Sequence, residues 1–290
     1  VVGRPTLLVA GRGLAVGVGS GTDALILSLL ALGLGRGDEV LIPAVSFFAT
    51  AGAVLAVGAT PVVVDVLADR PLADWGTARV SGRTRAAIPV HLFGDLAPDP
   101  ELGVPVVDDA AQAVGRRLPG GPGRLAALSF YPTKVLGAAG DGGAVLTDDE
   151  ALAARVRALG HHGMGLDGSF ALVGASPPRN SRLGAVQAAY LGAALVDLPA
   201  RVARRRAIAA IYEVELGVDR PGGGGLQSVP RDVESPVGVF CIRHTHRDRL
   251  AGRLRAAGVQ SRVYYPRPLT QEPALAHLLH PPVPNAMRFC

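Results

Sequence analysis

The segment Ser129-Phe130-Tyr131-Pro132-Thr133-Lys134, followed by Gly140-Asp141-Gly142-Gly143, contains the only lysine of the chain. The 290 residues hold 29 lysines and arginines together, so 28 of these are arginine. Arginine stays protonated at any workable pH, whereas lysine can lose its proton and act as a nucleophile or a base. A single lysine among so many arginines suggests a role that needs a free amine, although an arginine-biased composition could also leave one lysine by chance.

The chain around this segment alternates between strands and helices. Short β-branched runs and Ala/Leu-rich helical stretches follow one another through residue 150, which predicts an α/β sandwich with a mostly parallel sheet. The expected strands are Leu14–Val18, Glu39–Ile42, Pro61–Asp65, Ala86–Val90, Val104–Asp108, Ala126–Phe130 and Gly143–Leu146. The expected helices in this part are Thr22–Leu32, Ala49–Val57 and Asp149–Leu159.

The second half of the sequence predicts a smaller unit. Its segments are, in order, a Gly/Pro/Ser loop over 166–179, a long helical stretch Leu183–Glu215 that could bridge to another domain, the flexible loop Pro221–Gly225, and the elements Val237–Arg243, Arg247–Ala257 (a helix) and Val259–Val263. We therefore expect a large domain over 1–200 and a small α+β C-terminal domain over 201–290.

Composition excludes several classes of protein. Hydrophobic residues make up 49% of the chain, but no stretch reaches the roughly 18 unbroken apolar residues of a membrane span, so we expect no membrane partner. The apolar start is interrupted by Arg4, Arg12 and several glycines, which makes it a poor signal peptide. Two cysteines, Cys241 and Cys290, provide no disulfide framework and indicate a reducing cytoplasm.

The net charge of +5 and a pI near 9.7 could suggest a nucleic-acid partner. However, the arginines are scattered apart from Arg204-Arg205-Arg206, and aromatic residues are only 4%, which leaves few platforms for stacking bases. We therefore expect no nucleic-acid partner and interpret the charge as a solvated surface that favours an anionic substrate.

A glycine-rich turn lies near the start of the chain. In Gly17-Val18-Gly19-Ser20-Gly21-Thr22-Asp23, a strand leads into a turn that opens a helix. Free N–H groups and the dipole of a helix N-terminus bind phosphate, although such a turn is also ordinary in α/β proteins. The G-x-G-x-x-G spacing of dinucleotide sites is absent. A P-loop is excluded because the only lysine, Lys134, is followed by Val135.

Two carboxylates, Asp108 and Asp109, stand at the end of an apolar run, Val106-Val107. The carboxyl ends of strands are where α/β proteins place ligands, and a buried carboxylate needs a cationic or hydrogen-bonding partner. A metal ion would serve, but no histidine lies near in the sequence and no further ligands are evident. A protonated pyridine nitrogen would serve equally well.

The phosphate-binding turn, the strand-end aspartate and the solitary lysine together indicate pyridoxal 5'-phosphate. The aldehyde of this cofactor forms a Schiff base with lysine, its ring nitrogen pairs with an acidic residue, and its phosphate needs a nest of Gly, Ser or Thr. Phe47, which follows the strand Glu39–Ile42, could stack on the ring or could simply be a core aromatic.

With these residues, the chain resembles the DegT/DnrJ/EryC1/StrS family of sugar aminotransferases, among the fold-type I pyridoxal-phosphate enzymes. The resemblance runs from about Val16 to Gln271. The matching segments are Gly19–Leu25, Gly37–Val40, Pro43, Ser46–Phe47, Gly58–Pro61, Pro89–Gly94, Asp109–Gln112, Ser129–Lys134, Gly140–Gly143, Asn180–Leu183, Gln187–Ala189 and Tyr265–Pro266. It implies a large α/β/α domain with a mostly parallel sheet and a small α+β domain.

The resemblance also implies a role for each site residue. Lys134 would form the Schiff base and then serve as general base, Asp109 would pair with the ring nitrogen, and Gln112 would contact the hydroxyl side of the ring. The remaining roles are stacking by Phe47, phosphate binding by Gly21, Thr22 and Ser129, and contact of Asn180 with the phosphate of the neighbouring subunit's cofactor. The last role implies a homodimer with shared sites.

The implied reaction transfers an amino group, from glutamate, to a keto sugar nucleotide. Two alternatives stay open: the same cofactor acting on a cyclitol or aminoshikimate-type precursor, and a truncated cofactor-binding pseudoenzyme or regulatory partner. His161-His162 and His244-x-His246 lack further ligands at metal spacing, so we expect no metal. His91, at an expected strand end, is a weaker candidate for ligand contact.

Overall fold

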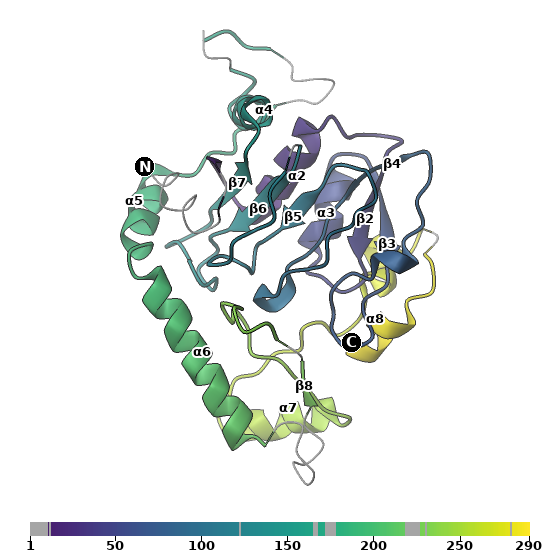
Figure 1. Cartoon of the computed structure of the whole chain (residues 1–290), viewed down its shortest axis with the longest axis vertical. Coiled ribbons are helices and arrows are strands. Elements are labelled where there is room, and N and C mark those ends of the chain that lie inside the picture. Colours follow the sequence, from purple (N-terminus) through teal and green to yellow (C-terminus); the bar gives the residue numbers. More distant parts are fainter. Residues whose placement is uncertain are drawn as a thin grey trace.

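A computed structural model describes residues 11, 13–121, 123–164, 168–171, 178–217, 227–229, 231–278 and 280–290. Its centre is a sheet whose strands are β1 (Leu14–Val18), β2 (Glu39–Pro43), β3 (Thr60–Val64), β4 (Thr84–Ala87), β5 (Val107–Asp109), β6 (Leu125–Ser129) and β7 (Gly143–Thr147). Isolated parallel bridges join the ordered sets β3-β2-β4 and β5-β6-β7-β1. Only β7 runs antiparallel to its neighbours, which confirms the mostly parallel sheet (Figure 1).

Helices cover both faces of this sheet, as expected for an α/β/α domain. On β6, Leu125 and Ala127 pack in the core beneath α2 (Gly21–Ala31), α3 (Ala49–Ala56) and α4 (Glu150–Gly160). The alternate residues Ala126 and Leu128 pack in a second core with α5 (Ala185–Ala194) and α6 (Leu198–Glu215). Since side chains alternate across a strand, these two clusters define the two buried faces of one sheet.

The expected helical stretch over 183–215 is two helices rather than one. Helix α5 ends at Ala194, and α6 begins at Leu198, with Pro199 in its first turn. Proline is favoured in the first turn of a helix because the N–H that it lacks would have no partner within the helix there. It also disfavours helical backbone in the residue before it, which favours a break at this point. The helix α6 then runs away from the sheet toward the smaller part of the chain (Figure 1).

The smaller part is more irregular than the sequence predicted. It contains β8 (Gln227–Ser228), β9 (Ile242–Arg243) and α7 (Arg247–Ala256). Of the elements expected over Val237–Arg243 and Val259–Val263, the first forms a strand only at its end, where β9 pairs with β8. Residues 259–263 form neither strand nor helix. The expected loop Pro221–Gly225 and part of the loop 166–179 lie outside the described residues.

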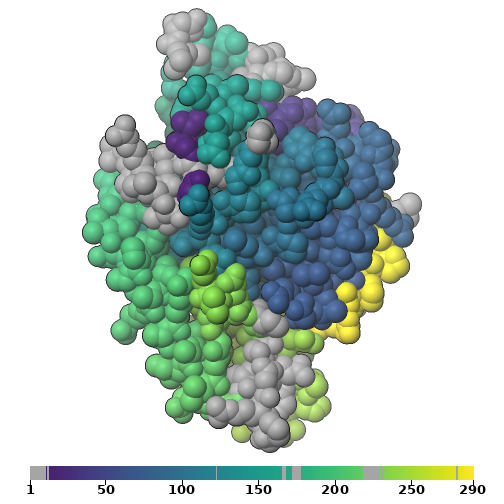
Figure 2. Space-filling view, viewed as in Figure 1, coloured from purple at the N-terminus to yellow at the C-terminus, as the bar shows by residue number. Residues whose placement is uncertain are grey.

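The last residues return to the large domain. The short helices η3 (Leu269–Gln271), η4 (Pro273–Leu275) and α8 (Pro284–Phe289) follow one another here. Buried residues of this segment, including Leu269 and Leu275, belong to the core that also holds β2 and β3, and Leu269 donates its N–H to the carbonyl of Ala44 at 2.8 Å. Figure 2 shows these residues (yellow) against the blue part of the large domain.

Two further features complete the fold. The outer side of β2, β3 and β4 is closed by a small cluster around Trp75, in the short helix η1 (Trp75–Thr77). Among the helices of the described residues, none has the length and apolar character that crossing a membrane requires.

Candidate functional site

Lys134 lies in the loop that follows β6 and is half-buried. The loop is tight, because a Cβ on Gly137 would come within 2.4 Å of the carbonyl oxygen of Pro132. Burial lowers the pKa of the Lys134 amine, while the negative charge of Asp109 acts in the opposite direction. A lowered pKa increases the neutral, nucleophilic fraction of the amine at any given pH.

Asp109, at the end of β5, faces the same site. Its carboxylate accepts hydrogen bonds from the hydroxyl of Thr50 at 2.8 Å and from the N–H of Ala111 at 3.2 Å. Ser46 and Thr50 share a further hydrogen bond of 2.7 Å. Burial raises the pKa of Asp109, and these donors together with Lys134 only partly offset that effect. A buried carboxylate with so little charge compensation suits a cationic ligand atom, such as a protonated ring nitrogen.

The first turn of α2 meets the end of β6. Ser20 caps the helix by accepting the N–H of Asp23 at 3.1 Å, so Gly21 and Thr22 occupy the first turn, whose N–H groups have no partner within the helix. A Cβ on Gly21 would lie 2.6 Å from Cβ of Ser129, which shows how closely the two segments approach. The structure therefore places Gly21, Thr22 and Ser129 next to one another, as the predicted phosphate site requires, and N–H groups at a helix N-terminus can bind a phosphate.

Gly21→Ala is expected to destabilise the protein and to weaken phosphate binding. The new methyl group would overlap the side chain of Ser129, and overpacking of this kind costs about 1–3 kcal/mol. Urea unfolding and cofactor titration measure the two effects. The matched control is Gly252→Ala in α7, where nothing lies within 4 Å of the added Cβ, and where alanine should stabilise the helix by about 0.5–1 kcal/mol. Equal behaviour of the two variants would contradict the cradle.

Phe47 and Gln112 complete the set expected around the ring. Phe47 lies between β2 and α3 and is 61% exposed, so it is not the core aromatic that its pattern also allowed. The side-chain oxygen of Gln112 accepts the N–H of Phe93 at 2.7 Å, and its side chain is hydrogen-bonded to the hydroxyl of Tyr265. The pKa of Tyr265 is raised by burial. The ring face of Phe47 is thus available to a planar ligand, whereas the amide of Gln112 is held by Phe93 and Tyr265.

Three residues of the site were not assigned by sequence. Thr50 and Ser46 hold Asp109, and Tyr265 reaches Gln112 from the distant end of the chain. Ser46 and Tyr265 lie in segments that match the family pattern, but the match did not indicate what either residue does in the site. Thr50 gave no sequence signal, because its partner Asp109 lies 59 residues away.

Asn180 is not gathered around Lys134. Its side chain is exposed and accepts a hydrogen bond from Arg182 at 3.1 Å. Its neighbour Ser181 accepts the N–H of Gly19 at 3.0 Å and donates to Asp23 at 2.8 Å, which fixes this segment beside the glycine-rich turn. Asn180 is therefore exposed at the surface of this chain, with Arg182 as a hydrogen-bond partner.

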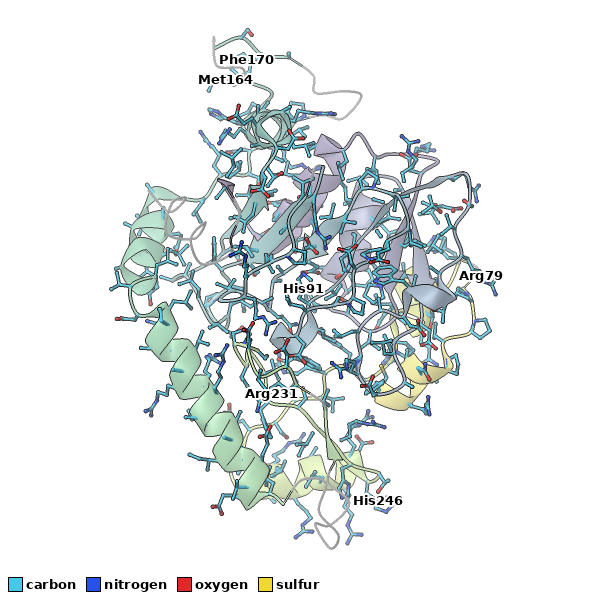
Figure 3. All side chains as sticks on the ribbon, in the orientation of Figure 1. Arg79, His91, Met164, Phe170, Arg231 and His246 are labelled. Atoms are coloured by element: carbon cyan, nitrogen blue, oxygen red, sulfur yellow. The ribbon has the colours of Figure 1, made fainter. Side chains whose placement is uncertain are left out.

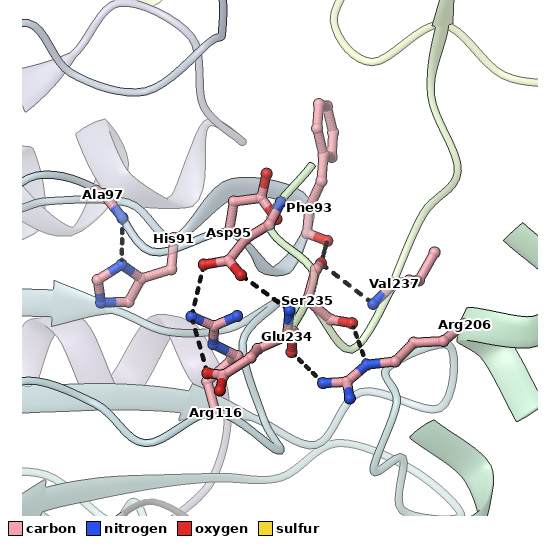
Figure 4. A network of polar contacts seen from close by, with 10 residues as sticks. His91, Phe93, Asp95, Ala97, Arg116, Arg206, Glu234, Ser235 and Val237 are labelled. Carbon is pink, nitrogen blue, oxygen red and sulfur yellow. Dashed lines mark hydrogen bonds and ion pairs between the residues drawn. The ribbon is translucent and has the colours of Figure 1, made fainter. Parts of the chain in front are cut away.

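His91 is fully buried near the centre of the molecule (Figure 3). Its Nδ1 accepts the N–H of Ala97 at 3.0 Å, and its Nε2 lies 3.2 Å from the carboxylate of Asp108. Asp108 is also held by Arg124, whose Nε and Nη2 each donate to it at 2.7 Å. Burial raises the pKa of Asp108, but hydrogen bonds from Arg124 and His91 outweigh it and leave the pKa lowered. The two ring nitrogens of His91 thus interact with Ala97 (Figure 4) and Asp108 of the protein itself, and His91 stabilises the strand ends.

Arg124→Leu is expected to destabilise the protein by about 3–5 kcal/mol, because it leaves the buried Asp108 without its main counter-charge. The measurement is the free energy of unfolding in urea. The control, Arg70→Leu, removes an exposed pair with the adjacent Asp69 and should cost less than about 1 kcal/mol. Similar losses for the two variants would show that the buried network contributes no more than a surface pair.

Two other features of the structure concern ligand binding. Within the described residues, no group of three or more His, Cys, Asp or Glu side chains could hold a metal ion. A cavity of about 750 Å³ adjoins Lys134 and lies between the loop after β6, α5, α6 and residues 237–240.

The chain is similar to known proteins over most of its length. The model of the DegT/DnrJ/EryC1/StrS aminotransferase family matches residues 9–290. The chain belongs to this family. The aminotransferase is 43% identical over 280 residues to the erythromycin biosynthesis sensory transduction protein EryC1 of Saccharopolyspora erythraea, covering 92% of this chain and 75% of that protein.

Two further comparisons define the aminotransferase more closely. It is 42% identical over 287 residues to the UDP-N-acetyl-3-dehydro-alpha-D-glucosamine 3-aminotransferase of Acidithiobacillus ferrooxidans, covering 93% of this chain and 75% of that one. The crystal structure of S. venezuelae DesV in complex with a ketimine intermediate matches with a TM-score of 0.88 at 37% identity, covering 99% of this chain and 80% of that chain. The fold is that of fold-type I enzymes, and the cofactor is pyridoxal 5'-phosphate.

Proposed function

We propose that this aminotransferase moves an amino group from glutamate to the keto carbon of a sugar nucleotide, which yields an amino sugar. The observation that carries the proposal is the pairing of the only lysine, with its lowered pKa, and the buried Asp109 in one site. Support for the acceptor comes from the Acidithiobacillus relative, whose name specifies a 3-dehydro sugar linked to UDP.

Each site residue has a distinct task in this proposal. Pyridoxal phosphate, when bound, supplies an aldehyde that takes up amines and a ring that accepts electrons. Lys134 would hold the cofactor through its amine and would serve as the general base that carries a proton from the α-carbon of the donor to the former aldehyde carbon of the cofactor. Asp109 keeps the ring nitrogen protonated, while Phe47 covers the ring and Gln112 orients it.

The phosphate lies, in this proposal, in the cradle of Gly21, Thr22 and Ser129. Asn180 of one subunit reaches the cofactor of the other, so the enzyme acts as a homodimer. Helix α5 supports such an interface, because it has no charged residue and exposes Val186 and Tyr190 four residues apart on one face. The free cysteines Cys241 and Cys290 fit a reducing, cytoplasmic setting.

Mixing two inactive variants tests the shared site. Lys134→Ala and Asn180→Ala homodimers should each be impaired, whereas a mixed dimer assembles one site with both native residues. Recovery of activity on mixing, seen together with a dimer in light scattering, supports the shared arrangement. A monomer, or no recovery from a confirmed mixed dimer, argues against it.

The amino-donor half-reaction tests the function itself. The purified protein carrying pyridoxal phosphate should convert it to the pyridoxamine form on addition of glutamate, with loss of the yellow colour. Restoration of the colour by a keto sugar nucleotide completes the cycle. A protein that binds the cofactor but never reacts with any amino donor would instead favour a regulatory role, which the sensory-transduction name of the Saccharopolyspora relative suggests.

A further inference from the structure

Two buried hydroxyl groups form a line of hydrogen bonds that ends at Asp109. Thr50 is fully buried, and Ser46 and Asp109 are 4% and 7% exposed. Oγ1 of Thr50 lies 2.8 Å from Oδ2 of Asp109, and Oγ of Ser46 lies 2.7 Å from Oγ1 of Thr50. Threonine hydroxyls commonly bond to backbone groups close by in the sequence. Thr50 instead bonds to a carboxylate 59 residues away, so its hydroxyl joins the start of α3 to the end of β5.

The backbone of Asp109 is fixed by the sheet. Its N–H donates to the carbonyl of Pro89 at 2.9 Å, and its carbonyl accepts the N–H of His91 at 3.0 Å. Only the rotation of the carboxyl group remains to be set, and each of its oxygens has a donor. Thr50 donates to Oδ2, and the N–H of Ala111 donates to Oδ1 at 3.2 Å. The carboxyl group is therefore held in one orientation from both sides.

The direction in which the two hydroxyls donate follows from their chemistry. An ionised carboxylate only accepts hydrogen bonds, and a hydroxyl has one proton to donate. When Asp109 is ionised, Thr50 must direct its proton to Oδ2, so Ser46 must donate to Thr50. If Asp109 took up a proton, Oδ1 would still face the N–H of Ala111, so the proton would lie on Oδ2 and both hydroxyls would have to turn round. This set of donors therefore favours the ionised form.

The hydroxyl of Thr50 has a large influence on the charge of Asp109. The titratable groups that act on this carboxyl group are Lys134 in the loop after β6, His91 beyond the end of β4, and Tyr265 near the end of the chain. Burial raises the pKa of Asp109, and the hydrogen bond from Thr50 is the largest of the effects that lower it. Removal of this hydroxyl should therefore change the ionisation of Asp109 more than removal of any other neighbour.

The turn that carries the two hydroxyls also carries Phe47. The N–H of Thr50 donates to the carbonyl of Phe47 at 3.1 Å, and Ser46 directly precedes Phe47. Since Thr50 is bonded both to Phe47 and to Asp109, one segment holds the exposed aromatic ring and the carboxylate. A planar ligand that stacks on Phe47 would thus find the carboxylate in a fixed position at its edge.

We propose that Ser46 and Thr50 are positioning residues for the cofactor, which keep Asp109 ionised and oriented toward the protonated ring nitrogen. They act through Asp109 and not on the substrate. This inference rests on the proposed function, because that function pairs Asp109 with the ring nitrogen. It assigns to two hydroxyl groups the task of maintaining the charge on which the pairing depends.

Infrared difference spectroscopy of the cofactor-free protein, recorded as a function of pH, tests this inference without any turnover. Asp109→Asn identifies the carboxyl band, because that variant lacks it. In Thr50→Val, the titration midpoint of Asp109 should rise by about one pH unit, since valine keeps the shape of threonine but removes a hydrogen bond that stabilises the charged form. Thr50→Ser keeps the hydroxyl and should restore the native midpoint.

Thr147→Val in β7 is the matched control. Thr147 is also buried, and its hydroxyl donates to the carbonyl of Arg124 at 3.0 Å rather than to Asp109. This variant should lose stability as Thr50→Val does, but should leave the titration midpoint of Asp109 unchanged. Ser46→Ala keeps Thr50 in place and should raise the midpoint by less than Thr50→Val, which provides the same test should Thr50→Val fail to fold.

Titration of pyridoxal phosphate into the same variants gives a second readout. Thr50→Val should bind the cofactor about 10-fold more weakly, in keeping with a shift of about one pH unit, whereas Thr147→Val should bind it as the native protein does. An unshifted midpoint in Thr50→Val and Ser46→Ala, an equal shift in Thr147→Val, or unchanged cofactor affinity in Thr50→Val would overturn the inference. Failure of the glutamate half-reaction in the native protein would instead remove the proposed function, while the infrared shift, measured without the cofactor, would stand.

Discussion

Replacement of Lys134 by alanine is expected to abolish amino transfer, with a loss of about 10⁴-fold or more. The reason lies in the composition as well as in the site. All other long basic side chains are arginines, which do not lose their proton, so no other side chain can supply a neutral amine. The variant should also fail to retain a yellow cofactor after dialysis.

Borohydride reduction provides the measurement. In the native protein, reduction should fix the cofactor to Lys134, and peptide mapping distinguishes this position from the terminal amine. Lys134→Arg is the matched control for charge: it restores a cation in the same loop but no nucleophile, and should be as inactive as the alanine variant. A yellow, reducible Lys134→Ala protein, or labelling at another group, would exclude Lys134 as the attachment point.

Much of the large domain follows from local sequence patterns. Each of the seven strands expected through residue 147 is present, displaced by a few residues at most, because alternation of β-branched runs with helical stretches is a local property. The sequence also identified Lys134 and Asp109 as candidate site residues, the first because it is the only lysine and the second because it stands at the end of a strand. Their joint site follows from the parallel strands, whose carboxyl ends meet at one edge.

The remaining features depend on contacts between distant residues. Nothing in the sequence near Thr50 shows that it holds Asp109, and nothing near Arg124 shows that it is buried against Asp108. The small unit was the least predictable, because its strands β8 and β9 have only two residues each, and local β-propensity over 259–263 did not suffice to form a strand.

The two neighbouring aspartates are expected to give opposite phenotypes when each is changed to asparagine. Asp109→Asn removes the charge that pairs with the ring nitrogen and should lower kcat about 100-fold, the effect of losing one strong charge-assisted interaction. Its stability should be unchanged or higher, because burial raises the pKa of Asp109 and the native protein holds that charge at a cost.

Asp108→Asn should behave in the reverse manner, since it lies one residue away but bonds Arg124 and His91 rather than the site. Loss of its charge leaves the guanidinium of Arg124 with only Asp99 and should cost about 3 kcal/mol of unfolding free energy, with a much smaller change in kcat for the folded protein. Parallel measurement of kcat and urea unfolding compares the two. If both variants lost stability alone, Asp109 would be a structural residue and the cofactor's ring nitrogen would need another partner.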